Sequence, residues 1–85
     1  MPVISRFLGI AISMFHREHE PPHFHAAYGD FEVSISIRDG TVRGTFPRRA
    51  TRHVMEWLGL HRAELLVNWD RARNKLPLNP IAPLE

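Results

Sequence analysis

The sequence contains no cysteine, which excludes disulfide bonds and sites built on a thiolate. It has no apolar run long enough to cross a membrane, and its first residues lack the apolar core of a signal peptide. We therefore expect a cytoplasmic protein without a membrane partner. With 85 residues, the chain provides a single domain, residues 1–85, with no repeat and no linker.

The sequence also lacks a strong charge of either sign. Its 11 lysine and arginine residues against 9 acidic residues leave a net charge of +2, and arginine is the predominant cation. This balance permits nucleic acid as a partner but does not require it. The hydrophobic fraction of 44% is ordinary for a folded chain, so we do not expect long disordered segments.

Segments with alternating apolar residues predict an antiparallel sheet within residues 3–46. The expected strands cover residues 7–15, 23–28, 31–37 and 41–46. The pairs Gly29–Asp30 and Asp39–Gly40 predict two-residue hairpin loops, because tight primed turns need residues that tolerate a positive φ. Pro47 ends the sheet.

Two-residue loops would fix which strand residues lie opposite each other: Tyr28 opposite Phe31, and Arg38 opposite Thr41. A β-bulge in either hairpin would shift this register. The outer face then carries two polar rows, one of His23, Ser36 and Arg43 and one of His25, Ser34 and Thr45. The apolar inner face consists of Phe24, Ala26, Tyr28, Phe31, Val33, Ile35, Ile37, Val42 and Phe46.

Residues 48–74 are free of proline and carry one stripe of residues at helical spacing, apolar except for His61. We predict one long helix, with Gly59 as the place for a kink; two helices that change direction are the alternative. The proline-rich residues 75–85 predict an extended tail. The fold class is therefore α+β: a four-stranded antiparallel meander with one face covered by the carboxy-terminal helix.

Four of the six histidines lie in one short segment, at His16, His19, His23 and His25. Residues two apart on a strand share a face, so His23 and His25 stand together. With a histidine from before Pro21–Pro22, they form a candidate zinc site, because zinc needs three or four ligands in a small volume. Without cysteine or a firm fourth ligand, we expect no cofactor, with zinc as the alternative.

Donor-rich side chains make the outer face and the helix start candidate anion or nucleic-acid sites. Arginine binds phosphate bidentately, and hydroxyls add further donors. Arginines at a helix amino terminus oppose the macrodipole, whereas a phosphate there gains from both the arginines and the free N–H groups. An exposed sheet face and a solvated basic turn are the alternatives. The candidate contacts are Arg43, Arg48, Arg49, Arg52, Ser34 and Ser36.

The outer face also permits a catalytic interpretation. His23 and His25 can act as general acid and base in metal-independent RNA cleavage, with Arg43 stabilising the phosphorane. This chemistry requires the two imidazoles to flank the scissile phosphate, which pairing on one strand does not guarantee. His61 and Glu64, one helical turn apart, form a second polar cluster that can equally be hydrogen-bonded at the edge of the core.

Several segments carry a family resemblance: residues 4–7, 19–25, 28–29, 47–49, 56–57, 60–66, 68–69 and 81–84. Through them the chain resembles a family of small bacterial proteins known as domain of unknown function 4160. The resemblance implies no established activity, and family members look like components of toxin–antitoxin type gene pairs. Gly59 departs from the family's pattern. The resemblance places a site, if there is one, at His19, His23, His25, Arg48, Arg49, His61 and Glu64.

Together, these features predict a small module that binds nucleic acid or a partner, as a component of a toxin–antitoxin type gene pair, rather than an enzyme. The alternatives are a ribonuclease that uses His23 and His25, and a histidine-rich metal-binding protein.

The tail and the sheet edges predict association with a second chain. Edge strands leave backbone groups unpaired, and once the helix covers the sheet the tail's apolar residues have no obvious inner surface. We expect a homodimer or a small protein partner, in contact through the tail or an edge strand; a tail folded back along its own helix is the alternative. The residues concerned are Leu76, Leu78, Ile81 and Leu84.

The metal alternative can be tested directly. We expect added zinc or a chelator to leave the melting temperature of the purified protein nearly unchanged, because a metal stabilises a protein only where the folded state binds it, and we expect no such site. Elemental analysis that finds one zinc per chain would contradict this expectation.

Overall fold

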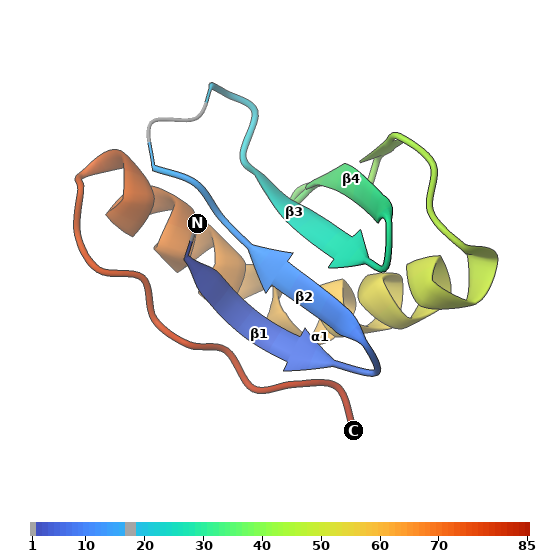
Figure 1. The fold of residues 1–85 in the computed structure, drawn as a ribbon. Helices are drawn as coiled ribbons and strands as arrows, with labels where there is room; N and C mark the ends of the chain where they lie inside the picture. Colours follow the sequence, from blue (N-terminus) through green and yellow to red (C-terminus); the bar gives the residue numbers. More distant parts are fainter. Residues whose placement is uncertain (1, 17–18) are drawn as a thin grey trace.

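The computed structural model describes residues 2–16 and 19–85, and it consists of a five-stranded antiparallel sheet with one long helix on one face (Figure 1). The strands follow one another in chain order across the sheet, so the topology is a meander. This confirms the predicted α+β class. The elements are β1 (Val3–Phe7), β2 (Ile10–Ser13), β3 (His23–Tyr28), β4 (Phe31–Ser36), β5 (Val42–Arg43) and α1 (Arg48–Arg73).

The predicted count of four strands is wrong, because the segment from Val3 to Ser13 is a hairpin rather than one strand over residues 7–15. Leu8 and Gly9 form its turn, with φ values of 51° and 80°. Phe7 pairs with Ile10 across this turn. Leu8 falls inside the strand predicted over residues 7–15, whereas it is 56% exposed at the tip of the turn.

The register of the β3–β4 hairpin is confirmed, with Tyr28 opposite Phe31 at its end. The predicted β4–β5 register is wrong by two residues, because Ser34 lies opposite Arg43. The backbone N–H of Ser36 donates to Thr41 O and that of Gly40 donates to Ser36 O, both at 2.9 Å, so residues 37–40 form a four-residue loop. The shift is even, so every side chain keeps its predicted face.

The strand predicted over residues 41–46 shortens to Val42–Arg43 because the chain turns away at Gly44, where φ is 113°. A side chain at this position would lie 3.2 Å from the carbonyl oxygen of Glu32. Glycine is therefore needed both for the conformation and for the close approach to β4.

The core lies between the inner face of the sheet and α1. Trp57 is completely buried there, with its ring centroid 5.4 Å from Phe7 and 5.7 Å from Phe24. Two residues predicted on this face, Tyr28 and Phe31, are 39% and 43% exposed, because they extend beyond the part that the helix covers.

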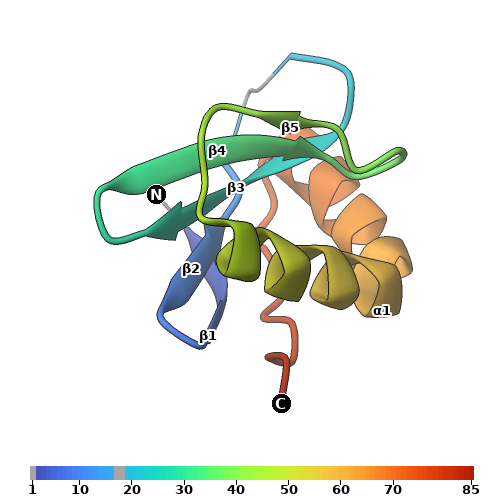
Figure 2. The ribbon, with the colours of Figure 1, turned by 90° about the vertical axis from the view of Figure 1, so that its right-hand side faces the viewer.

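The helix spans Arg48–Arg73, one residue less than predicted, and it is kinked. The non-helical residue is His61, with φ −125° and ψ 19°, and not Gly59. Figure 2 shows the two halves of α1 running in different directions. Within residues 2–16 and 19–85, no helix is long and apolar enough to cross a membrane.

The tail, residues 75–85, has no regular secondary structure and runs back along β1 (Figure 1). The N–H of Ile81 donates to Ile4 O at 2.8 Å, and its side chain is 4% exposed. Leu78 and Leu84 also pack against the core, so the expectation that the tail lacks an inner surface is wrong for these residues. Leu76 remains 46% exposed, and association with a second chain stays a prediction.

Asn68 should hold the tail in place. It is fully buried, donates from Nδ2 to Asn79 O at 2.8 Å, and accepts the Asn79 N–H at 2.8 Å. Asn68→Ala removes both bonds, and we expect a loss of roughly 2 kcal/mol in unfolding free energy. Asn79→Ala is the matched control: Asn79 uses only its backbone here, so its change should stay within about 0.5 kcal/mol. Chemical denaturation would measure both, and equal losses would contradict the assignment.

Candidate functional site

The outer face of the sheet carries a pocket of about 420 Å³, which we call the outer-face pocket. The meander places β3, β4 and β5 side by side, so polar side chains from all three strands meet there. Four residues predicted from the sequence as anion contacts or catalytic groups are brought together: His23, Ser34, Ser36 and Arg43. The pocket is also lined by His19, Glu20, Pro21, Asp39 and Thr41.

The two histidines of β3 have different surroundings. His23 Nδ1 lies 2.8 Å from Pro21 O, and because a carbonyl can only accept, Nδ1 is the donor. The ring of His25 stands edge-on to Phe15 at 4.6 Å, and His25 does not line the outer-face pocket. The two imidazoles pack against each other edge-on, with 5.3 Å between their ring centroids.

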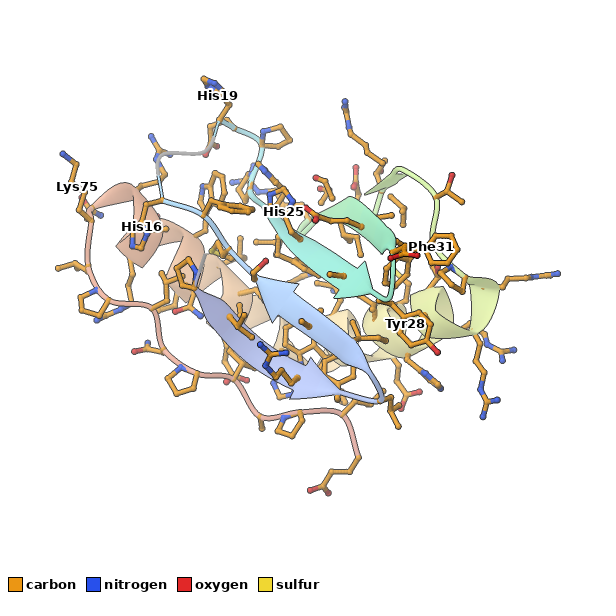
Figure 3. All side chains as sticks on the ribbon, in the orientation of Figure 1. His16, His19, His25, Tyr28, Phe31 and Lys75 are labelled. Carbon is orange, nitrogen blue, oxygen red and sulfur yellow. The ribbon has the colours of Figure 1, made fainter. Side chains whose placement is uncertain are left out.

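The histidines predicted as metal ligands do not converge. His16 Nε2 lies 3.4 Å from Leu76 O, next to the tail, while His19 is in the loop before β3. Figure 3 shows His16, His19 and His25 on separate parts of the molecule. In the described part of the chain, no group of three or more histidine, aspartate or glutamate residues is placed to hold a metal ion.

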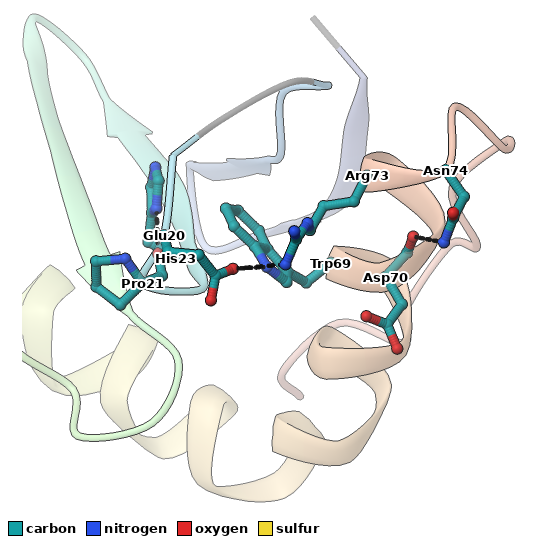
Figure 4. Close-up of polar contacts among 7 residues, drawn as sticks. All are labelled: Glu20, Pro21, His23, Trp69, Asp70, Arg73 and Asn74. Carbon is teal, nitrogen blue, oxygen red and sulfur yellow. Dashed lines mark hydrogen bonds and ion pairs between the residues drawn. The ribbon is translucent and has the colours of Figure 1, made fainter.

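Two carboxylates give the outer-face pocket a mixed charge. The backbone N–H of Thr41 lowers the pKa of Asp39 most strongly, and the hydroxyls of Thr41 and Ser36 lower it further. Glu20 accepts hydrogen bonds from Trp69 Nε1 at 2.8 Å and from Arg73 at 3.0 Å (Figure 4). The negative charges of both carboxylates repel an anion that approaches Arg43.

His61 and Glu64 form the hydrogen-bonded pair that their spacing indicates, with 2.6 Å between His61 Nδ1 and Glu64 Oε1. His61 lies at the kink of α1 and packs on Trp57 at a centroid distance of 5.5 Å. Arg62 donates from Nε to Ile37 O at 2.8 Å beside it. Neither His61 nor Glu64 lines the outer-face pocket, and His61 connects the helix kink to the core through its contact with Trp57.

A second candidate surface lies at the start of α1, which we call the basic helix start and define as Arg48, Arg49 and Arg52. All three are exposed, and the first turn contains no acidic residue. Pro47 precedes the helix and provides no side-chain cap. Because α1 covers the inner face of the sheet, the basic helix start and the outer face are separate surfaces (Figure 2).

The basic helix start adjoins a pocket of about 250 Å³ that the sequence did not predict. The β1–β2 turn, the end of β3 and the helix all contribute to it. The alternation of apolar residues placed Tyr28 on the inner face of the sheet. Its position next to the β3–β4 turn is the one feature of the sequence that indicates an exposed side chain. The pocket is lined by Leu8, Tyr28, Pro47, Arg49, Ala50 and His53.

A family model described as a domain of unknown function, DUF4160, matches residues 9–70. The chain belongs to this family. The matched region contains the outer-face pocket and the basic helix start, but not the tail. No curated protein and no solved structure matches the chain.

The Asp39 carboxylate should titrate below the ordinary range of aspartate. Its contribution to stability is therefore present above the ordinary aspartate pKa and is lost as the pH falls through the lowered value. Thr41→Val removes one hydroxyl but keeps the backbone N–H, the strongest cause, so the pKa should rise only partly. An NMR titration of the Asp39 carboxyl carbon measures both, and an ordinary pKa in the unchanged protein would refute this account.

Proposed function

We propose that this protein is a nucleic-acid-binding module whose contact surface is the basic helix start. The observation that supports it best is the exposure of Arg48, Arg49 and Arg52 at a helix amino terminus without an acidic residue or a side-chain cap in its first turn. Cations at this end oppose the helix dipole, so folding alone does not favour them. Phosphate groups would be attracted by both the arginines and the free N–H groups.

The outer-face pocket is a weaker candidate for the phosphate contact. Its one arginine, Arg43, shares the pocket with the carboxylates of Asp39 and Glu20. Asp39 stays ionised to low pH because its pKa is lowered. Binding rather than cleavage is the proposal, because His25 stays outside the pocket that holds His23 and Arg43.

Replacing the three arginines of the basic helix start by alanine should weaken binding of a labelled oligoribonucleotide at low salt by roughly tenfold or more. The dependence of affinity on salt should also become less steep, by about 0.7 in the logarithmic slope for each lost phosphate contact. Fluorescence anisotropy across a salt series measures both effects.

A matched control removes the same number of charges elsewhere, from Arg6, Arg38 and Lys75, which are all exposed. This variant has the same net charge as the first, so it isolates the position of the arginines from the overall charge. It should keep most of the affinity and the original slope. Equal losses in the two variants, or no binding by the unchanged protein at low salt, would refute the proposal.

A further inference from the structure

We propose that the surface beside the basic helix start recognises nucleic acid as a single strand, by stacking bases on Tyr28 and Phe31. This inference rests on the proposed function and names the form of nucleic acid that the module takes. It starts from two aromatic side chains that alternation assigns to the core and that the structure leaves 39% and 43% exposed.

The two aromatic residues are the last pair of the β3–β4 hairpin. They belong to the inner face, as Phe24 and Val33 do, but they lie beyond the part of that face that α1 covers. Figure 3 shows both of them at the end of the molecule where α1 begins. The uncovered end of the apolar face therefore lies next to the arginines.

The ring of Tyr28 is held by its neighbours. It packs against Phe46 at a centroid distance of 6.3 Å. It also lies close to Gly9, where an added Cβ would be 3.0 Å from Tyr28 Cε1. A ring fixed in this way loses little conformational entropy when a base stacks on it.

The pocket of about 250 Å³ brings one residue of the aromatic pair, Tyr28, together with one arginine of the basic helix start, Arg49. Tyr28 and Leu8 give it an apolar wall, and Arg49 and His53 give it donors. Two exposed acidic residues, Asp30 and Glu32, flank Phe31 in the sequence, and the helix start carries three exposed arginines. Apolar stacking surfaces beside cations suit a base and its phosphate together.

This combination discriminates between strand forms. In a duplex the bases are stacked on one another, so no base face is free to stack on the aromatic rings. Only phosphate contacts then remain. A single strand offers free base faces to the rings as well as phosphates to the arginines. A preference for single strands therefore follows from the aromatic pair, and general affinity follows from the arginines.

The test uses a labelled oligoribonucleotide without self-complementarity, alone and annealed to its complement, in fluorescence anisotropy at low salt. The unchanged protein should bind the single strand more tightly. The variant Tyr28→Ala with Phe31→Ala should lose roughly tenfold or more on the single strand, with duplex affinity and salt slope unchanged. Tyr28→Trp with Phe31→Trp should keep the preference. The control Leu60→Ala with Val67→Ala removes two other exposed apolar residues, 66% and 52% exposed, and should change nothing.

A second measurement needs no substitution. Tyr28 is the only tyrosine in the chain, so labelling tyrosine rings gives NMR signals from this residue alone. Single-stranded RNA should shift these signals upfield through base stacking, and the duplex should not.

Unchanged Tyr28 signals at saturating single strand, or equal affinity for both forms, would overturn the inference while leaving the proposed function in place. An absence of binding to either form at low salt would remove both.

Discussion

The burial of Trp57 constrains most of the structure. Its indole fills the space between sheet and helix, and its Nε1 must find an acceptor because an unpaired buried donor is costly. Ala82 O accepts this bond at 2.9 Å, which brings the tail across the domain. The tail then pairs through Ile81 with Ile4 and covers the outer edge of β1. One buried aromatic residue thus joins sheet, helix and tail.

The kink at His61 adapts a long helix to a small sheet. Trp57 and Leu58 are buried before it, and Leu65 and Trp69 are buried after it, so both halves of α1 contribute to the core. The first half points its amino terminus toward the exposed aromatic pair. The second half reaches the loop before β3, where Trp69 donates to Glu20.

The sequence predicted what depends on local alternation and on two-residue loops, and it failed where a turn has another length. The pairing of Tyr28 with Phe31 follows from the two-residue Gly29–Asp30 loop. The predicted β4–β5 register is wrong because the loop there has four residues, 37–40, in place of the two residues Asp39–Gly40. Alternation gives a residue's face but not how far the helix covers that face. The sequence therefore grouped His23, Ser34, Ser36 and Arg43 of the outer-face pocket correctly and missed the surface around Tyr28.

Residues 19–25, which in the sequence most resemble a metal-binding or catalytic site, contribute mainly to the stability of the fold. Pro22 is fully buried and its carbonyl accepts the Ile37 N–H, while the carbonyl of Pro21 accepts from His23. Phe24 belongs to the core, and His23 packs on Trp69 at a centroid distance of 5.2 Å. These contacts explain a run of prolines and aromatic rings without a ligand. The arginines at the start of α1 are exposed and oppose the helix dipole, and this contrast favours that end for the proposed binding surface.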